Sequence, residues 1–346
     1  MKESSGNNEM KLAILILAHK NLGQLKKLIN SLLHDNLDIF IHLDKKWKLS
    51  EAEYNSLLHI NKDKVFLSDN RISASIYLWS LVDATMELVK KAKKIEIEKN
   101  KGYKYFALLS GQDFPIKPID DLINLLQKSY PKPYIDCTPY HPRNWMKGKF
   151  KTLPLENKVL LFFINRWKPG KLRRFLNMLI KLPIYSYFKF LKLFIETPFK
   201  KLNHEGCKLY GGSAWWILPD KAINIIHQRY SDPNDKVVKY LSKTFSPEET
   251  FFQIMVMQTE VASLVELNPA LDLKQNCLTY SHFRDIGKPF TGHPYILGID
   301  DFKKLNNLPH FFARKFDITV DSGIFDMIDQ EILNQSNNSD TKKWAV

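Results

Sequence analysis

The chain has 346 residues, of which 44% are hydrophobic and 25% are charged, and its formal net charge is +14. This is the composition of an ordinary globular protein. Its three cysteines, Cys137, Cys207 and Cys277, form no Cys-x-x-Cys pair, which argues against a disulfide framework or a zinc site and favours a reducing cytosol. The N-terminus lacks the apolar core of a signal peptide, and no apolar run is long enough to span a bilayer. We therefore expect a cytoplasmic protein, with any membrane contact peripheral and at the inner face of the plasma membrane.

Most of the positive charge lies in one segment, residues 147–201. Fourteen lysines and arginines stand there against Glu156 and Glu196, a net charge of +12, so the rest of the chain is nearly neutral. This distribution disfavours a general nucleic-acid-binding protein. Aromatic residues interleave with the cations, a pattern that suits the surface of an anionic membrane. A solvated lid that packs on the body, and a nucleic-acid site, remain alternatives for this segment.

The first fifty residues predict a strand, a helix and a second strand. Lys11–His19 is a near-continuous apolar run, as expected of a parallel strand buried on both faces. Apolar residues then recur at helical spacing after Asn21, and Leu37–Leu43 predicts a strand that ends at Asp44. Such a unit favours a nucleotide-binding α/β domain. No Gly-x-Gly-x-x-Gly or P-loop follows the first strand, which removes the main support for a dinucleotide or NTPase site.

Two more strands are predicted at Lys64–Ser68 and Tyr103–Leu109, with an amphipathic helix over Ile76–Lys90 between them. Ligands of open α/β sheets bind at the carboxyl ends of the strands. Each candidate there, taken alone, is also a common turn residue. The predicted strand ends carry three polar residues that we take together as site candidates: His19, Asp44 and Asp113.

The stretch Phe245–Gln253 predicts a helix start anchored in a core. Ser246 is a favourable N-cap residue, Pro247 suits the first helical position, and Glu248 and Glu249 are favourable in the first turn. The apolar residues that follow would hold the two carboxylates in place, as a general base requires. On these residues alone, an acidic helix start without a further role is the commoner interpretation.

Two other stretches of the second half offer binding residues. Within Leu209–Pro219, the adjacent Trp215 and Trp216 face opposite sides of a strand, so at most one of them faces a ligand. Near the C-terminus, Arg314 and Lys315 stand between aromatic residues, and such a pair of cations suits a diphosphate.

Six segments, in order, resemble a known family. They are AILILAHKN (13–21), IFIHLDKK (39–46), YFALLSGQDFPIKP (105–118), YGGSAWWILPD (210–220), FSPEETFFQ (245–253) and FFARKFD (311–317). Together they resemble the core-2/I-branching β-1,6-N-acetylglucosaminyltransferase family, glycosyltransferase family 14, which also contains the peptide O-xylosyltransferases. The basic segment has no counterpart among these matches.

The resemblance implies a GT-A-type α/β fold, with a Rossmann-like, mostly parallel central sheet flanked by helices. We expect one catalytic domain over residues 11–333, between a flexible tail (1–10) and a disordered tail (334–346). Within it we expect a UDP-binding half (11–135), the basic aromatic insertion (147–202) and an acceptor and catalytic half (205–333).

The resemblance also implies an inverting, metal-independent glycosyltransferase. It would move a sugar from a UDP-sugar to a hydroxyl of a glycan or lipid-linked acceptor, with GlcNAc as the leading sugar and xylose as the alternative. The sequence holds no Asp-x-Asp, the usual metal-binding motif, which agrees with the absence of a metal cofactor. A catalytically inactive glycan- or nucleotide-binding protein on the same fold is the alternative from another class.

Residue by residue, the resemblance places the catalytic base at Glu249, the acid directly before Thr250-Phe251-Phe252. The diphosphate-binding lysine falls on Lys315, and Arg284 or Arg314 would supply a second charge. On the donor side it implies His42, Asp44 and Asp113, and the strand-end residue His19 joins them as a candidate. On the acceptor side it implies Tyr280 and His282, with Trp215 or Trp216 at the border of the same pocket. We add Glu248, the neighbour of the base, as an acceptor-side candidate.

Overall fold

The computed structural model describes residues 10–139, 198–244, 246–267, 276–282 and 294–333. Both predicted tails except Met10, nearly all of the basic insertion, and Arg284 lie outside the described residues.

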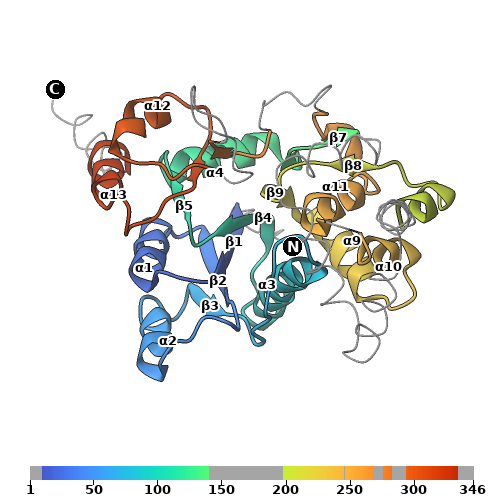
Figure 1. Ribbon diagram of the computed structural model, residues 1–346, viewed down its shortest axis with the longest axis horizontal. Helices are drawn as coiled ribbons and strands as arrows, with labels where there is room; N and C mark the ends of the chain where they lie inside the picture. The colour runs from blue at the N-terminus through green and yellow to red at the C-terminus, as the bar shows by residue number, and fades with distance from the viewer. Residues whose placement is uncertain (1–9, 140–197, 245, 268–275, 283–293, 334–346) are drawn as a thin grey trace, which may run out of the picture.

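A six-stranded sheet forms the centre of the molecule (Figure 1). Its strands follow the order β3-β2-β1-β4-β9-β6. The first four are parallel to one another, and β9 is antiparallel to both of its neighbours. This confirms the predicted α/β class with a mostly parallel, Rossmann-like sheet, as in a GT-A-type fold. The strands are β1 (Lys11–Ala18), β2 (Leu37–Leu43), β3 (Val65–Leu67), β4 (Tyr103–Ser110), β9 (Trp216–Pro219) and β6 (Tyr134–Ile135).

Helices cover both faces of this sheet, because its strands are apolar on both sides. Along β1, Leu15 packs into the core on one face, and Ile14 and Ile16 pack into the core on the other. The first core is covered by α3 (Trp79–Glu98), α9 (Asp220–Ser231), α10 (Lys236–Leu241) and α11 (Phe251–Val256). The second is covered by α1 (Leu22–Ser31), α2 (Glu51–Leu58), α4 (Ile119–Ser129), α12 (Phe302–Asn306) and α13 (Gly323–Ile328).

A three-stranded sheet brings the C-terminal part of the chain to the end of β4. In this sheet β11 (Phe312–Arg314) pairs parallel with β10 (Thr279–Ser281) and antiparallel with β5 (Asp113–Pro115). The register sets Arg314 opposite Asp113. Residues about 200 positions apart therefore meet at the carboxyl edge of the central sheet.

Several short elements complete the described chain. A two-stranded sheet pairs β7 (Thr138–Pro139) with β8 (Tyr210–Gly211). Single turns of 3-10 helix lie at η1 (Pro247–Glu249), η2 (Ala262–Leu264) and η3 (Ile299–Asp301), and a π-helical turn lies at η4 (Asp329–Leu333).

The prediction that a helix starts at Ser246 is wrong. Ser246 adopts a left-handed conformation, with φ of 51°, and its side chain caps nothing. A 3-10 turn, η1, holds both glutamates, and Thr250 with φ of −134° separates it from α11. The reason is tertiary: the backbone N–H of Ser246 donates to the Tyr77 carbonyl, so the chain approaches the helix along a path set by another loop.

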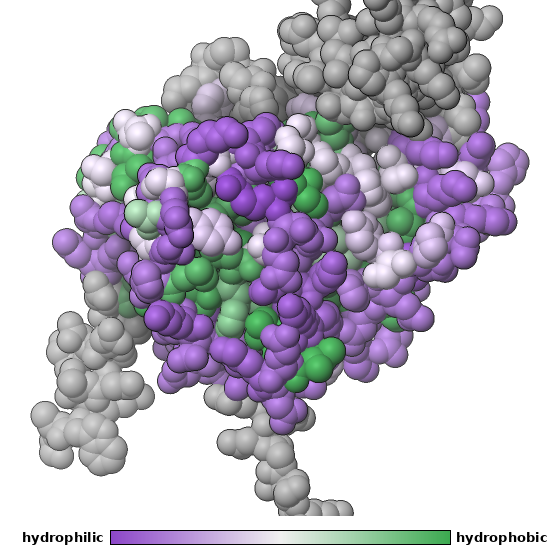
Figure 2. Space-filling model, turned by 90° about the horizontal axis from the view of Figure 1, so that it is seen from below, coloured by the Kyte–Doolittle hydropathy of each residue, from purple (hydrophilic) through white to green (hydrophobic). Residues whose placement is uncertain are grey.

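The helix predicted over Ile76–Lys90 begins later and ends later than expected. It starts at Trp79 and continues through the charged run to Glu98. Pairs one turn apart, Lys93 with Glu96 and Lys94 with Glu98, help to extend it. None of the helices in the described part of the chain combines the length and apolar character needed to span a bilayer. One face of the molecule is mostly hydrophilic, interrupted by small apolar patches (Figure 2).

Candidate active site

Cations gather at the carboxyl ends of β1 and β2. His19 follows β1, and desolvation of its imidazole lowers its pKa most, followed by the positive charges of Lys20, Lys315 and Lys46. Asp44, at the end of β2, opposes them. His19 is therefore neutral near pH 7, and the edge carries a positive potential. Such a potential suits the phosphates of a nucleotide.

Lys315 belongs to the same group of cations. It is half-buried, and burial lowers the pKa of its amine, as do the neighbouring Arg314 and Lys20. Lys20 itself bonds to Asp317, with 2.5 Å between Nζ and Oδ2. A partly desolvated lysine among other cations gains from a bound anion, which is the property that a diphosphate site requires.

His42 and Asp44 hold a loop of the chain in place. The Ile72 N–H donates to His42 Nε2 at 2.8 Å, and the Ala74 N–H donates to Asp44 Oδ2 at 3.1 Å. His42 is 1% exposed, and burial lowers its pKa to about 4. Its imidazole is thus a buried acceptor for the loop. We revise its predicted role from contact with the donor to support of the residues around it.

Asp113, like His42, is buried and bonded to groups of the protein. It is fully buried and accepts from the N–H of Ser110 at 2.8 Å and from its hydroxyl at 2.7 Å. Its Oδ1 lies 3.4 Å from Arg314 Nε. Burial raises the pKa of Asp113 and lowers that of Arg314, and each charge opposes the shift of the other. Asp113 is thus buried against Arg314, and its predicted place on the donor side stays a prediction.

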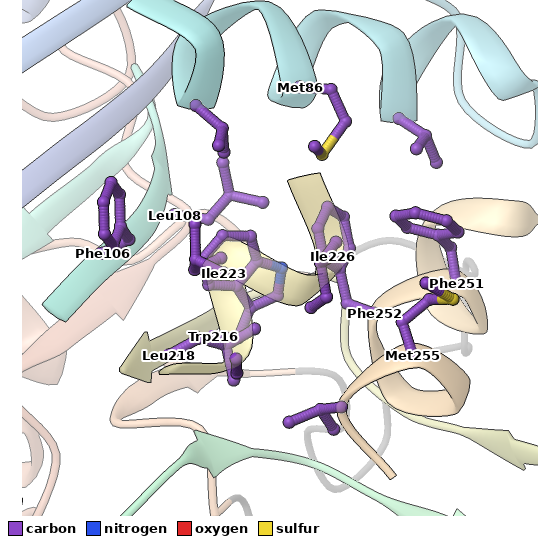
Figure 3. Close-up of a cluster of buried hydrophobic side chains, with 14 of the residues drawn as sticks. Met86, Phe106, Leu108, Trp216, Leu218, Ile223, Ile226, Phe251, Phe252 and Met255 are labelled. Atoms are coloured by element: carbon purple, nitrogen blue, oxygen red, sulfur yellow. The ribbon is translucent and has the colours of Figure 1, made fainter. Parts of the chain in front are cut away.

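The side chains of Trp215 and Trp216 lie in different environments, as the alternation of side chains along a strand predicts. Trp216 is 1% exposed and packs on Phe252, with 4.7 Å between ring centroids, inside the core that Figure 3 shows. Trp216 is therefore a core residue in this structure, and of the two tryptophans Trp215 remains the candidate for the acceptor side. Trp215 is half-buried and carries the Arg314 guanidinium, whose Cζ lies 4.0 Å from the ring centroid. This contact completes the enclosure of Arg314.

Glu249 sits on a turn that is fixed from two sides. The Gly212 N–H donates to the Glu249 carbonyl at 3.0 Å, and the Glu249 N–H donates to the Ser246 carbonyl at 3.1 Å. Nearby, Gln253 Nε2 donates to the Ser213 carbonyl at 2.7 Å. The Glu249 residue is half-buried, whereas Glu248 is buried and accepts a bond from the Tyr77 backbone. Glu249 is thus the more accessible acid, and Glu248 is turned toward another loop rather than toward an acceptor.

Tyr280 and His282 lie on the other side of the small sheet. Ser281 is the residue of β10 that pairs with Arg314, and alternation puts Tyr280 on the opposite face. The rings of Tyr280 and His282 stack on each other, and Lys304 lies against both. The structure does not bring this pair together with Trp215 and Glu249, so their predicted place on the acceptor side gains no support.

Sequence reasoning missed four residues that build the site. Lys20 and Lys46 adjoin predicted strand ends, and a search for cations next to those ends would have found them. Arg71 donates to the carbonyls of Leu43 and Asp44 from a stretch without periodicity, so no local pattern marks it. Gln24 is fully buried and bonds to the carbonyls of Gly111 and Phe316, but it looks like an ordinary surface residue of a helix.

Comparison with known proteins identifies a matching family and several relatives of this chain. The family model of the Core-2/I-Branching enzyme matches residues 12–306. The chain is 21% identical over 354 residues to a beta-1,3-galactosyl-O-glycosyl-glycoprotein beta-1,6-N-acetylglucosaminyltransferase of Bos taurus, covering 97% of this chain and 72% of the relative. It is 23% identical over 351 residues to a beta-glucuronosyltransferase of Arabidopsis thaliana, covering 97% and 69%. It is 24% identical over 343 residues to a xylosyltransferase of Caenorhabditis briggsae, covering 94% of this chain and 37% of the relative.

Proposed function

The chain belongs to the Core-2/I-Branching enzyme family, and from this premise we propose that it is an inverting, metal-independent glycosyltransferase that uses a UDP-sugar. Glycosyl transfer in general is what its matched relatives have in common. The nucleotide, the stereochemistry and the independence of metal are the finer parts of the proposal.

The main support for the proposal is that the segment of residues 210–216 contacts both the turn of Glu249 and the cations near Lys315. Gly212 bonds to the backbone of Glu249, and three residues later Trp215 carries Arg314, the neighbour of Lys315 in the chain. Lys315 in turn belongs to the cationic edge around His19. One short segment thus connects the candidate base with the candidate phosphate site.

In the proposed reaction the acceptor hydroxyl attacks C1 of the donor sugar from the side opposite UDP. The Glu249 carboxylate takes the hydroxyl proton as the new C–O bond forms, and the bond from C1 to the phosphate oxygen breaks. UDP leaves with the electron pair, and its negative charge is stabilised by Lys315 together with Lys20 and Lys46. A single displacement of this kind inverts the anomeric centre and needs no covalent enzyme intermediate.

Two features support independence of a metal ion. Fixed cations stand at the proposed diphosphate site, which is the task that a divalent ion performs in other sites. The loop after β4, Ser110–Asp113, offers one carboxylate, and that carboxylate is buried and paired with Arg314.

For the donor sugar, GlcNAc leads and xylose is the alternative. The segment SGQDFPIK resembles the N-acetylglucosaminyltransferases, and the bovine relative bears that activity in its name. The segment FFARKFD resembles the xylosyltransferases, one of which is also a relative. The Arabidopsis relative adds glucuronic acid to the sugars worth testing. For the acceptor we propose a hydroxyl of a glycan or a lipid-linked oligosaccharide.

A donor screen tests the proposal. UDP release is measured from UDP-GlcNAc, UDP-xylose and UDP-glucuronate with a panel of glycan and lipid-linked acceptors, each in EDTA and in manganese. We expect one preferred donor, equal turnover in EDTA and manganese, and a β-linked product by NMR from the α-linked donor. Activity lost in EDTA and restored by manganese contradicts the metal-independent mechanism, and an α-linked product contradicts inversion.

A further inference from the structure

The loop between β3 and α3 links two parts of the candidate site, and we call residues 71–78 the strap. Its first half is bonded to the end of β2. The Ile72 N–H donates to His42 Nε2 at 2.8 Å, the Ala74 N–H donates to Asp44 Oδ2 at 3.1 Å, and the Lys45 N–H donates back to the Ile72 carbonyl at 3.0 Å. This half of the strap is therefore part of the donor side.

The second half of the strap is bonded to the turn that carries the two glutamates. The Tyr77 N–H donates to Glu248 Oε1 at 3.0 Å, and the Ser246 N–H donates to the Tyr77 carbonyl at 3.3 Å. Tyr77 and Ser246 both have left-handed backbone conformations, with φ of 71° and 51°. Such conformations are uncommon outside glycine and persist where surrounding contacts impose them. Here Tyr77 accepts from the Ser246 N–H and donates to Glu248, so one residue of the strap is bonded to two residues of the turn.

The packing beyond the strap keeps the same two elements together. Helix α3 begins at Trp79, directly after the strap. The Trp79 ring meets the edge of Phe251, with 5.2 Å between centroids, and Phe251 opens α11 two residues after Glu249. A shift of the strap is thus transmitted to the base-bearing turn by hydrogen bonds at Glu248 and by ring contacts at Trp79.

From this geometry we propose that Glu248 is a positioning residue, whose carboxylate locks the strap to the turn and so sets Glu249 relative to the donor site. The proposal rests on the proposed function and deepens it. It gives Glu248 a role different from the acceptor contact that the sequence suggests. The side chain is 6% exposed and is directed to the Tyr77 backbone, whereas the neighbouring Glu249 is half-buried.

The charge of Glu248 is secondary to its acceptor oxygen in this role. A glutamine has the same shape and also offers an oxygen to the Tyr77 N–H, so it preserves the bond in a weaker, neutral form. An alanine removes the bond and leaves the part-buried Tyr77 N–H without this acceptor. The pair Glu248→Gln and Glu248→Ala therefore separates positioning from chemistry.

The first experiment compares kcat and the KM values for donor and acceptor in these two variants. Displacement of a reacting group by about 1 Å costs on the order of a hundredfold in rate. We expect Glu248→Ala to lower kcat by about 10- to 100-fold with an acceptor KM near that of wild type. We expect Glu248→Gln to recover kcat to within about fivefold of wild type. Glu51→Ala, which removes an exposed acid from the first turn of α2, is the matched control and keeps wild-type kinetics.

Three results overturn the proposal. A raised acceptor KM in both variants with kcat retained makes Glu248 an acceptor contact. A loss of several orders of magnitude in Glu248→Gln makes it the base itself. A lower melting temperature in Glu248→Ala with kcat unchanged makes its role structural alone. If Glu248→Ala does not fold, the glutamine variant still decides between positioning and the first two outcomes.

A second experiment distinguishes failure of this inference from failure of the proposed function. Hydrogen exchange of the Tyr77 amide requires no turnover. We expect exchange at Tyr77 to be faster in Glu248→Ala than in wild type and close to wild type in Glu248→Gln. Unchanged exchange at Tyr77 in Glu248→Ala overturns the lock, whatever the enzyme transfers. Faster exchange in a protein inactive with every UDP-sugar instead leaves the lock standing and rejects the proposed reaction.

Discussion

The polar residues of the site divide into two kinds according to their partners. His42, Asp113 and Glu248 are buried and are bonded to backbone groups of the protein. His19 is exposed and Glu249 is half-buried, so these two residues are less enclosed than the first three. Residue type does not distinguish the two kinds, since a histidine and a glutamate occur in each. The sequence therefore marked both kinds alike as site candidates and did not separate the buried ones from the more exposed ones.

His42 makes this difference measurable through pH. Its pKa falls from 6.5 to about 4 on folding because the imidazole is buried. Between these values the unfolded chain binds a proton that the folded protein does not, so the stability contribution is present above pH 6.5 and is lost as the pH falls toward 4. At about 1.4 kcal/mol per pH unit, His42 alone removes about 2 kcal/mol from the free energy of unfolding between pH 7 and pH 5.

Urea unfolding of wild type and His42→Gln at pH 7, 6 and 5 tests the pH dependence of stability that we assign to His42. Glutamine accepts the Ile72 bond and does not titrate, so the free energy of unfolding should fall less steeply with pH in the variant. Parallel curves for the two proteins would show that His42 does not carry this dependence.

At the scale of elements, strands were predicted well and the acidic turn was not. The observed β1, β2 and β4 agree with the predicted strands to within one residue, because a strand buried on both faces leaves a continuous apolar run in the sequence. The conformation of the turn at Ser246–Glu249 depends instead on hydrogen bonds to Tyr77 and Gly212, which come from distant parts of the chain. Capping patterns describe a local preference, and here tertiary bonds override it.

Gly212 shows how closely two of these elements approach. A Cβ at this position would lie 1.9 Å from the Asp136 carbonyl oxygen, so the backbone must move to accept any side chain. Its N–H also holds the Glu249 carbonyl. We expect Gly212→Ala to lower the free energy of unfolding by about 1–3 kcal/mol, as overpacking does, and to lower kcat by displacing Glu249.

Gly23 is the matched control for this substitution. It lies in α1, and nothing stands within 4 Å of a Cβ added there. Gly23→Ala should therefore be neutral or slightly stabilising in thermal unfolding, since alanine favours a helix over glycine. Equal effects of the two alanines would refute the close approach at Gly212.

At the scale of the whole molecule, the two predicted halves share their sheets. Strand β9 from the second half lies between β4 and β6 of the first, and β11 from the second half pairs with β5 of the first. Arg314 and Lys315 thus reach the carboxyl edge of the central sheet from the far end of the chain. Local patterns predicted the strands themselves, but this interleaving depends on antiparallel pairs that no local pattern specifies.

The charge distribution of the chain leads to a prediction about membranes. We propose that the cations of residues 147–201 bind anionic lipid, which would hold the protein at the inner face of the plasma membrane. Wild type should sediment with vesicles rich in phosphatidylserine, and a variant with these lysines and arginines changed to glutamine should not. Changing exposed lysines of α3, such as Lys90 and Lys94, provides the control. Salt-sensitive retention of wild type on RNA or DNA without vesicle binding would favour a nucleic-acid site instead.

The central claim is that Glu249 is the base of a glycosyl transfer, and Glu249→Gln tests it most directly. The measurement pairs turnover of the preferred UDP-sugar with calorimetric binding of the same donor, using Glu51→Gln as the control. Because a positioned general base contributes about 10²- to 10⁴-fold, we expect turnover to fall by that factor while the donor Kd stays within about threefold of wild type. Wild-type turnover in Glu249→Gln would contradict the account, and donor binding without turnover in the wild type itself would favour a catalytically inactive binding protein.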